Sequence, residues 1–507
     1  MKKYFILLLL FHFFSASQAQ NIEEIDTYLE KSIKDWEVPG ISVGIVKDGK
    51  VILAKGYGLK DVNGSAKVDE NTLFAIASNT KAFISSSLAI LVAEGKVTWD
   101  DPVRKYIPEF EMYNNYVSNN TTIADLLSHR AGLGTFSGDM MWYKSNLEVN
   151  DLIGKIKYLE PAYPFRAGYG YSNLMFITAG EVIKRITGQE WNEYAKAQFF
   201  DPLQMDRTIT STNDLKTLGN YAMPHKPFEG ETKSIPWVNW DNMGAAGGII
   251  SSATDMSQWM MMQLNNGVNQ NDSIIDSKQQ NIAWTLHNSR VLSQKSKDRV
   301  PGRHFNGYGL GWVLGDYYGR QIVSHSGGYD GMYSRVMMLP DEKLGVVILT
   351  NSMKGNTYPL CMYIMNQFIK EDLRDWSDDF LNQKSGGANK VQTRIDELKN
   401  ARVKKSKPSV KLTAYAGKYN SSMHGNITIT QVEDNLKLTF EDAPNLGATL
   451  THWHNDTWQI NWDETHAWFD FGLVTFAVDN TFQVKGMNIE VPNYDIFFDE
   501  VDLVRVE

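Results

Sequence analysis

A serine and a lysine three positions apart, Ser78 and Lys81, are the side chains best suited to covalent chemistry. Ser78-Asn79-Thr80-Lys81 is the only Ser-x-x-Lys in the 507 residues, and it stands where an apolar run over 73–77 meets a predicted helix over 79–94. Positions three apart share one helix face, so the lysine amine can reach the serine hydroxyl. A serine nucleophile needs an adjacent base, and a lysine serves only when desolvation or neighbouring positive charge favours its neutral form. The pair predicts that Ser78 is acylated and that Lys81 accepts its proton, although a lone Ser-x-x-Lys also fits a solvated helix face.

A tyrosine and an asparagine, Tyr171 and Asn173, precede a second predicted helix over residues 174–187. A tyrosine hydroxyl can relay a proton to a leaving group, and an asparagine amide can orient both a substrate amide and a lysine. A further Tyr-x-Asn, Tyr113-Asn114-Asn115, lies in a polar loop. The tripeptide alone therefore fits an ordinary loop with a helix cap equally well.

A histidine and two glycines follow a predicted strand over residues 321–324, in the order His325-Ser326-Gly327-Gly328. A glycine in such a strand lets a substrate backbone approach closely. The Gly328 N–H, together with the Ser78 N–H, would supply two donors for the oxyanion of an acyl-transfer reaction. A lone histidine at a strand end is usually structural, so it is the combination of the three motifs that predicts one active site.

These motifs resemble those of the serine β-lactamase family, which also includes penicillin-binding carboxypeptidases, D-aminopeptidases and certain esterases. The Ser-x-x-Lys, Tyr-x-Asn and His/Lys-x-Gly motifs of that family are matched in order, within a resemblance that covers roughly residues 22–370. Further matches are Leu126-Leu127-Ser128-His129 with Gly132-Leu133 after it, and Gly244-Ala245-Ala246-Gly247-Gly248 followed by Ser252-Ala253-Thr254-Asp255. The resemblance looks closest to the branch with class C β-lactamases. It implies an α/β sandwich beside an all-helical lobe, with the site between them.

Two positions depart from the family pattern. His325 stands where true β-lactamases and carboxypeptidases usually have lysine, and Ala167-Gly168 replaces the usual Pro-Gly ahead of the tyrosine motif. A histidine is largely neutral near pH 7. We therefore expect weak binding of carboxylates such as that of a penicillin, improving as the imidazole becomes charged toward about pH 6. His129 matches a family histidine, and we expect its role to be structural.

The order of predicted elements indicates a sheet built from both ends of one domain, with a helical region inserted between them. Strand-like runs at 41–46 and 51–56 come first, helical signals dominate residues 79–263, and strands return between 309 and 350. The domain prediction is a signal peptide (1–19), a hydrolase domain (20–370), a linker with one exposed helix (371–409) and a small antiparallel β domain (410–507). The last resembles the lipocalin-like barrel appended to some hydrolases of this family.

The C-terminal domain is rich in tryptophan and histidine. We expect its tryptophans to form the barrel core; they are Trp453, Trp458, Trp462 and Trp468. A zinc site is the alternative raised by four further side chains, His452, His454, Asp456 and His466. Polar residues at a barrel rim fit them better, because no further ligand pattern is present. We therefore expect neither a metal nor a cofactor.

The N-terminal segment and the composition indicate the cellular compartment and limit the kinds of partner. The first 19 residues combine two lysines, a short apolar run and small residues, which is typical of a secretory signal and too short to span a bilayer. We expect an exported protein, periplasmic or secreted, with no transmembrane segment after signal removal. A net charge of -9 without a basic stripe argues against nucleic acid as a partner. Cys361 is the only cysteine, which excludes an internal disulfide. We expect it to be a small buried apolar side chain and not a reactive thiol.

The leading functional hypothesis is a serine hydrolase that works through an acyl-enzyme on small-molecule or peptide substrates. Its substrates would be D-amino-acid peptides, esters or β-lactams. The alternative is a non-catalytic sensor of the penicillin-binding type, which binds such ligands or is acylated once. Turnover separates the two, because a sensor would give one burst of product and then stop.

Overall fold

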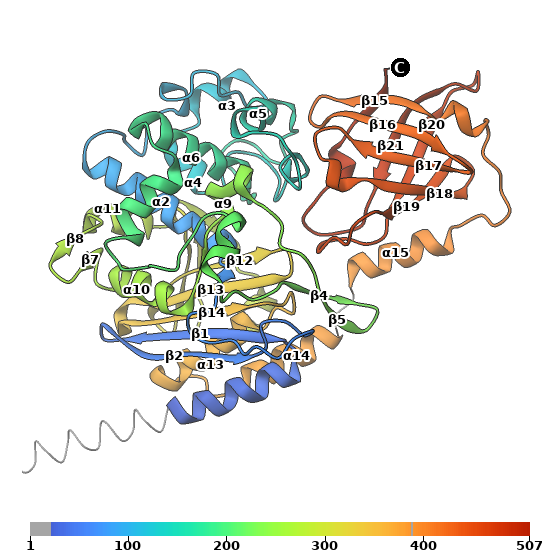
Figure 1. Ribbon diagram of the computed structural model, residues 1–507. Helices are drawn as coiled ribbons and strands as arrows, with labels where there is room; N and C mark the ends of the chain where they lie inside the picture. The colour runs from blue at the N-terminus through green and yellow to red at the C-terminus, as the bar shows by residue number, and fades with distance from the viewer. Residues whose placement is uncertain (1–21, 387–388, 507) are drawn as a thin grey trace, which may run out of the picture.

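The structure is a computed structural model that describes residues 22–386 and 389–506, so the predicted signal peptide lies outside the described residues. Figure 1 shows two parts: a mixed α/β part coloured blue to yellow, and a β-barrel coloured orange to red beside it. The predicted fold class, an α/β domain with a helical lobe plus a small antiparallel barrel, is confirmed. Within those described ranges, no helix is both long enough and apolar enough to cross a membrane.

An eight-stranded antiparallel sheet forms the base of the α/β part, in the order β2-β1-β14-β13-β12-β11-β10-β9. The N-terminal strand β1 pairs with β14 along its length, from Ile41 opposite Thr350 to Lys47 opposite Leu344. The sheet is thus built from both ends of the domain, as predicted. The strands are β1 Gly40–Lys47, β2 Lys50–Gly58, β9 Asn288–Arg290, β10 Asn306–Tyr308, β11 Val313–Tyr317, β12 Arg320–Tyr329, β13 Met332–Leu339 and β14 Leu344–Thr350.

Helices cover both faces of this sheet. On one face, the helix over residues 22–35 and α13 (Thr357–Ile369) form a buried cluster that includes Ile25 and Cys361. On the other face, α10 (Ala253–Leu264) packs directly against β1. A Cβ at Gly44 of β1 would lie 2.4 Å from the Ser257 hydroxyl oxygen, so this close packing requires glycine.

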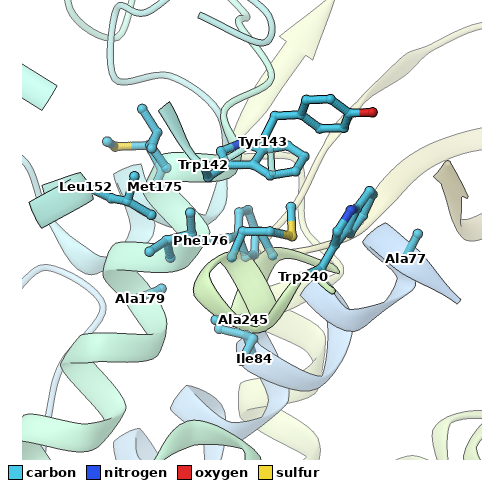
Figure 2. Close-up of a cluster of buried hydrophobic side chains, with 14 of the residues drawn as sticks. Ala77, Ile84, Trp142, Tyr143, Leu152, Met175, Phe176, Ala179, Trp240 and Ala245 are labelled. Carbon is cyan, nitrogen blue, oxygen red and sulfur yellow. The ribbon is translucent and has the colours of Figure 1, made fainter. Parts of the chain in front are cut away.

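The helical lobe lies above the sheet in Figure 1. Its main helices are α2 Thr80–Ala93, α3 Asn115–Asn120, α4 Ile123–Leu127, α5 Val149–Lys155, α6 Asn173–Thr187, α9 Gly244–Gly247 and α11 Ser277–Ala283. Figure 2 shows Leu152 of α5, Phe176 of α6 and Ala245 of α9 in one apolar cluster with Trp142 and Trp240. This cluster fixes the start of α2 relative to the start of α6, and those two helix starts carry the first two motifs.

The segment over 371–409, predicted to be a linker with one exposed helix, contains two helices. In α14 (Trp376–Gly386), Trp376 is fully buried in the cluster beneath the sheet, and Ser377 hydrogen-bonds Ser32 of the N-terminal helix with 2.6 Å between their hydroxyl oxygens. In α15 (Lys390–Asn400) no residue is buried. Through Trp376, α14 is therefore part of the core of the α/β part.

The C-terminal part is a closed eight-stranded barrel, in the order β15-β16-β17-β18-β19-β20-β21-β22. It closes where β15 pairs with β22, with Tyr419 opposite Arg505. Alternating strand positions such as Ile427, Ile429 and Leu438 are buried and fill its core. The strands are β15 Gly417–Ser421, β16 Gly425–Val432, β17 Asn435–Phe440, β18 Ala448–His454, β19 Thr457–Trp462, β20 Leu473–Val478, β21 Val484–Glu490 and β22 Leu503–Arg505.

The four tryptophans of the barrel do not share one environment. Trp458 belongs to the core and Trp462 packs against it, but Trp453 lies under the Arg402 guanidinium, 4.1 Å from ring centroid to carbon. Trp468 lines the cavity described below. The prediction of a common core therefore holds for Trp458, Trp462 and Trp468, because Trp468 also packs against the core. Trp453 is buried but lies outside that cluster, beside Arg402 of the preceding segment.

The barrel histidines likewise differ from one another. His454 Nδ1 accepts a hydrogen bond from the Val403 N–H at 3.0 Å, and His452 Nε2 donates to the Asn455 carbonyl at 2.8 Å. His466, predicted to lie on the rim, is instead 1% exposed and stacks on Phe469 with ring centroids 4.7 Å apart. Among the residues that the structure describes, no three His, Cys, Asp or Glu side chains are grouped as metal ligands would be.

Candidate active site

Ser78 lies on a short 3-10 turn, Ala77–Asn79, that leads directly into α2. The preceding residue, Ala77, has a φ of 47°, a left-handed conformation that is uncommon for alanine. Lys81 stands on the first turn of α2 and is fully buried. Its Nζ lies 3.1 Å from the Ser78 Oγ. The predicted three-residue spacing does bring the amine to the hydroxyl.

The Lys81 amine has two further oxygen partners. It donates to Asn173 Oδ1 and to the Ala246 carbonyl oxygen, each at 2.7 Å. Burial lowers the pKa of Lys81 to about 7, and the nearby Asp139 carboxylate opposes that shift. Because an ordinary lysine has a pKa near 10.4, this amine is neutral in a large fraction of molecules at physiological pH.

Asn173 is held by a residue that the sequence reasoning missed, Asp139. The Asn173 Nδ2 donates to Asp139 Oδ2 at 2.7 Å, which directs the amide oxygen toward Lys81. Asp139 is 2% exposed, and burial raises its pKa to about 8, although Asn173 and Lys81 act in the opposite direction. No local sequence signal marks Asp139, because its role arises only when the loop containing it packs against α6.

Tyr171 completes the group around the serine. Burial raises the pKa of its hydroxyl well above the usual value of 10, and the neighbouring Ser78 side chain partly offsets that rise. The Ser172 N–H donates to His129 Nδ1 at 3.1 Å, and the His129 ring lies 4.2 Å from the Tyr171 ring between centroids. His129 thus anchors the tyrosine motif through its backbone, the structural role expected of it.

His325 on β12 is a buried, neutral side chain. Its Nδ1 faces the Ser326 carbonyl oxygen at 2.7 Å, so Nδ1 carries the hydrogen and Nε2 accepts from the Tyr308 hydroxyl at 2.7 Å. Burial, with a smaller contribution from Lys81, lowers the pKa of His325 to about 3. The expectation that the imidazole becomes charged toward about pH 6 is therefore wrong, because this site is too desolvated for a second cation.

The two glycines of the third motif face different neighbours. A Cβ at Gly327 would lie 2.2 Å from the Ile76 carbonyl oxygen and 2.9 Å from the Ala77 Cβ. Gly327 therefore makes room for the turn that carries Ser78, and not for a substrate as the sequence suggested. Ser326 and Gly328 line the cavity instead. Strand β11 pairs with β12 only as far as Ser324, so among the described residues no strand pairs with the outer edge of residues 325–329.

A cavity of about 500 Å³ opens over Ser78 and contains most of the predicted site residues. Those that line it are Ser78, Tyr171, Asn173, His325, Ser326 and Gly328, while Lys81 and Gly327 lie behind its wall. Arg290 of β9 supplies a cation, and its guanidinium lies 4.5 Å from the Tyr169 ring centroid. The barrel contributes Trp468 and Asp495. Sequence reasoning missed Arg290 and Asp495 because neither stands near a motif.

Comparison with known proteins identifies the family. The model of the beta-lactamase family matches residues 25–360, and the chain therefore belongs to that family. The domain of unknown function DUF3471 matches residues 401–505, which include the barrel.

Curated relatives and solved structures extend this result. Unguisins hydrolase ungD of Aspergillus violaceofuscus is 28% identical over 458 residues, 81% of this chain and 79% of the relative. Protein flp of Staphylococcus aureus (strain MW2) is 28% identical over 366 residues, 71% of this chain and 69% of its own length.

Two solved structures share the fold. The octameric penicillin-binding protein homologue from Pyrococcus abyssi has a TM-score of 0.63 at 20% identity and covers 96% of this chain and 100% of its own. The D-amino acid amidase from Ochrobactrum anthropi SV3 has a TM-score of 0.57 at 22% identity, over 68% of this chain and 99% of its own. The longer overlap with the first extends the likeness beyond the α/β part.

Proposed function

We propose that this chain is an exported serine hydrolase that cleaves amide or ester substrates through an acyl-enzyme on Ser78. The Ser78 oxygen attacks the substrate carbonyl carbon while its proton passes to Lys81. Tyr171 and Lys81 then return a proton to the leaving group as the carbonyl–heteroatom bond breaks. Water attacks the resulting ester in the second half-reaction and releases the acid, regenerating the Ser78 hydroxyl.

The observation that carries this proposal is the set of acceptors around Lys81. A neutral amine has two N–H groups, and the Asn173 and Ala246 oxygens at 2.7 Å account for both. Its lone pair is then left for Ser78, 3.1 Å away. A protonated amine would have no lone pair with which to accept the serine proton. The pKa of about 7 makes the neutral form available.

Two backbone donors fit an oxyanion. The Ser78 N–H stands on the turn that leads into α2. Gly328 lies on β12 beyond Ser324, where the pairing with β11 ends. Both residues line the same cavity. Donors aimed at a developing oxyanion typically contribute on the order of 3 kcal/mol to catalysis.

The substrate class is best supported as an amide or ester of an amino acid or short peptide. One relative is named a hydrolase and one structural neighbour is a D-amino acid amidase. We further propose the division into a signal peptide, an α/β catalytic domain that includes α14, an exposed linker and the barrel. The competing function, a sensor that is acylated once, shares the first half-reaction only.

Covalent labelling tests the proposal. A fluorophosphonate probe should add one adduct to the purified protein by intact mass, and Ser78→Ala should remove it. Ser326→Ala, which alters another serine of the cavity, should keep the label. With a short-chain nitrophenyl ester, continued product release after the first equivalent would support the hydrolase, whereas a single burst would support the sensor. Labelling that persists in Ser78→Ala would overturn the assignment.

A further inference from the structure

The barrel forms part of the wall of the catalytic cavity. Trp468 comes from the loop between β19 and β20, and Asp495 from the segment between β21 and the turn Phe498–Glu500. A Cβ at Gly328 would lie 3.2 Å from the Tyr333 ring and 3.3 Å from the Trp468 ring. The two aromatic rings therefore flank the glycine at which the acyl group of a substrate would bind.

Hydrogen bonds hold both barrel loops in this position. The Gly138 N–H, adjacent to Asp139, donates to Glu500 Oε2 at 2.7 Å. Lys226 Nζ donates to the His466 carbonyl oxygen at 2.6 Å and to Asp470 at 2.7 Å. These contacts join the barrel to the α/β part at two separate places.

The loop that carries Asp495 is also fixed internally. The Asn493 side-chain oxygen accepts from the Asp495 N–H at 2.9 Å and from the Ile496 N–H at 2.6 Å. Its amide nitrogen donates to the carbonyl oxygens of Val491 and Ile496, both at 2.7 Å. Asp495 is thus presented on a preorganised loop.

The Asp495 carboxylate is half-buried, and within the described part of the chain its oxygens accept no hydrogen bond and form no ion pair. Its neighbour Asp330 differs, because that buried carboxyl accepts from the Tyr143 hydroxyl at 2.8 Å and the Trp240 indole at 3.1 Å. A partly desolvated carboxylate without a partner binds a cation favourably. Aromatic side chains, including Phe136, Tyr333 and Trp468, line the same cavity and suit an ammonium group through cation–π contact.

We propose that Asp495 is a specificity-determining residue supplied by the barrel, and that it binds a protonated amine on the acyl part of the substrate. This inference rests on the proposed hydrolase function and narrows its substrates to esters or amides that carry a free amine. The barrel then has a direct role in substrate selection, through a charge that the α/β part does not itself place there.

Two esters of equal shape test the charge alone. Glycine p-nitrophenyl ester and p-nitrophenyl propionate differ in the acyl group by an ammonium in place of a methyl. The readout is the ratio of their kcat/KM values, which cancels differences in enzyme quality between preparations. We expect Asp495→Asn to lower this ratio by about ten- to a hundredfold. The control is Asp499→Asn, an exposed acid on the same segment, which should keep the wild-type ratio.

Inhibition gives a second measurement that needs no turnover of the amine ester. Benzylammonium should inhibit propionate ester hydrolysis more tightly than benzyl alcohol in the wild type, and Asp495→Asn should remove the difference. Turnover of both esters with an unchanged ratio in Asp495→Asn would overturn the Asp495 assignment alone. Failure of either ester to turn over, together with no labelling of Ser78, would overturn the hydrolase function and this inference with it.

Discussion

Lys81 and Asp139 are joined through a single amide. The Asn173 side chain accepts from the Lys81 amine at 2.7 Å and donates to the Asp139 carboxyl at 2.7 Å. Burial moves the pKa of the amine down to about 7 and that of the carboxyl up to about 8. Both shifts favour the uncharged forms, so a buried lysine and a buried acid coexist without a permanent ion pair.

The pH dependence of acylation should report Lys81. Below about pH 7 its amine is mostly protonated and cannot accept the Ser78 proton, so the rate with an uncharged ester should fall about tenfold per pH unit. His325, with a pKa of about 3, does not titrate in this range. Asp495 does titrate in this range, because burial and Asp330 raise its pKa to about 6. Asp495→Asn is therefore the control, and it should keep the fall in rate below about pH 7. A flat profile between about pH 5 and 7 would contradict the role of Lys81.

Asp139 should act by positioning Asn173. Asp139→Ala leaves the buried Asn173 Nδ2 without its acceptor, at a cost of about 1–3 kcal/mol, and lets the amide rotate away from Lys81. We expect kcat to fall about ten- to a hundredfold with little change in KM. Asp139→Asn keeps an acceptor oxygen and should retain activity within a few-fold. Equal losses in the two variants would show that the charge of Asp139, and not its hydrogen bond, is required.

The sequence was sufficient for elements whose partners lie close along the chain. Ser78 and Lys81 are three residues apart, and helix periodicity alone brings them together. The remaining contacts of Lys81 come from Asn173 and Ala246, which are 92 and 165 positions away. Contacts between positions so far apart in the sequence can be inferred only through a family resemblance. The resemblance identified Asn173 but assigned no contact to the Ala246 carbonyl.

Residues without a motif could not be predicted at all. Arg290 stands on a three-residue edge strand and Asp495 in a loop of another domain. Both reach the cavity through the packing of segments whose own sequences carry no sign of it. Gly327 shows a different limit, because the sequence indicated that glycine was required there but not which neighbour, the Ile76 carbonyl, requires it.

Trp376 should define the end of the catalytic domain. Its side chain is fully buried, and its indole N–H donates to the Asp372 carbonyl at 3.2 Å. Trp376→Ala should lower the free energy of unfolding of this part by about 3–5 kcal/mol, measured by chemical denaturation. Leu373→Ala, at a side chain that is 57% exposed, should have little effect. A chain cut after residue 370 should unfold more readily than one cut after residue 386, and equal stability of the two would place the boundary at 370.

Arg290 should bind the carboxylate that His325 cannot. The neutral His325 supplies no cation to the cavity, whereas the Arg290 guanidinium lines it, 4.5 Å from the Tyr169 ring centroid. A charge-assisted hydrogen bond is worth about 1.5–3 kcal/mol. Arg290→Gln should therefore slow acylation by a penicillin at least about tenfold relative to an uncharged ester.

The role of Arg290 is tested by stopped-flow measurement of acylation rates. The penicillin and the ester are each compared in the wild type, Arg290→Gln and Lys295→Gln. Lys295 is exposed and outside the cavity, so its substitution removes the same charge without touching the site. The effect of Arg290→Gln should be the same at about pH 6 and pH 8, because His325 is neutral at both. An equal loss of penicillin acylation rate in Lys295→Gln would show that Arg290 acts only through long-range charge. An unchanged penicillin rate in Arg290→Gln would show that the carboxylate binds elsewhere.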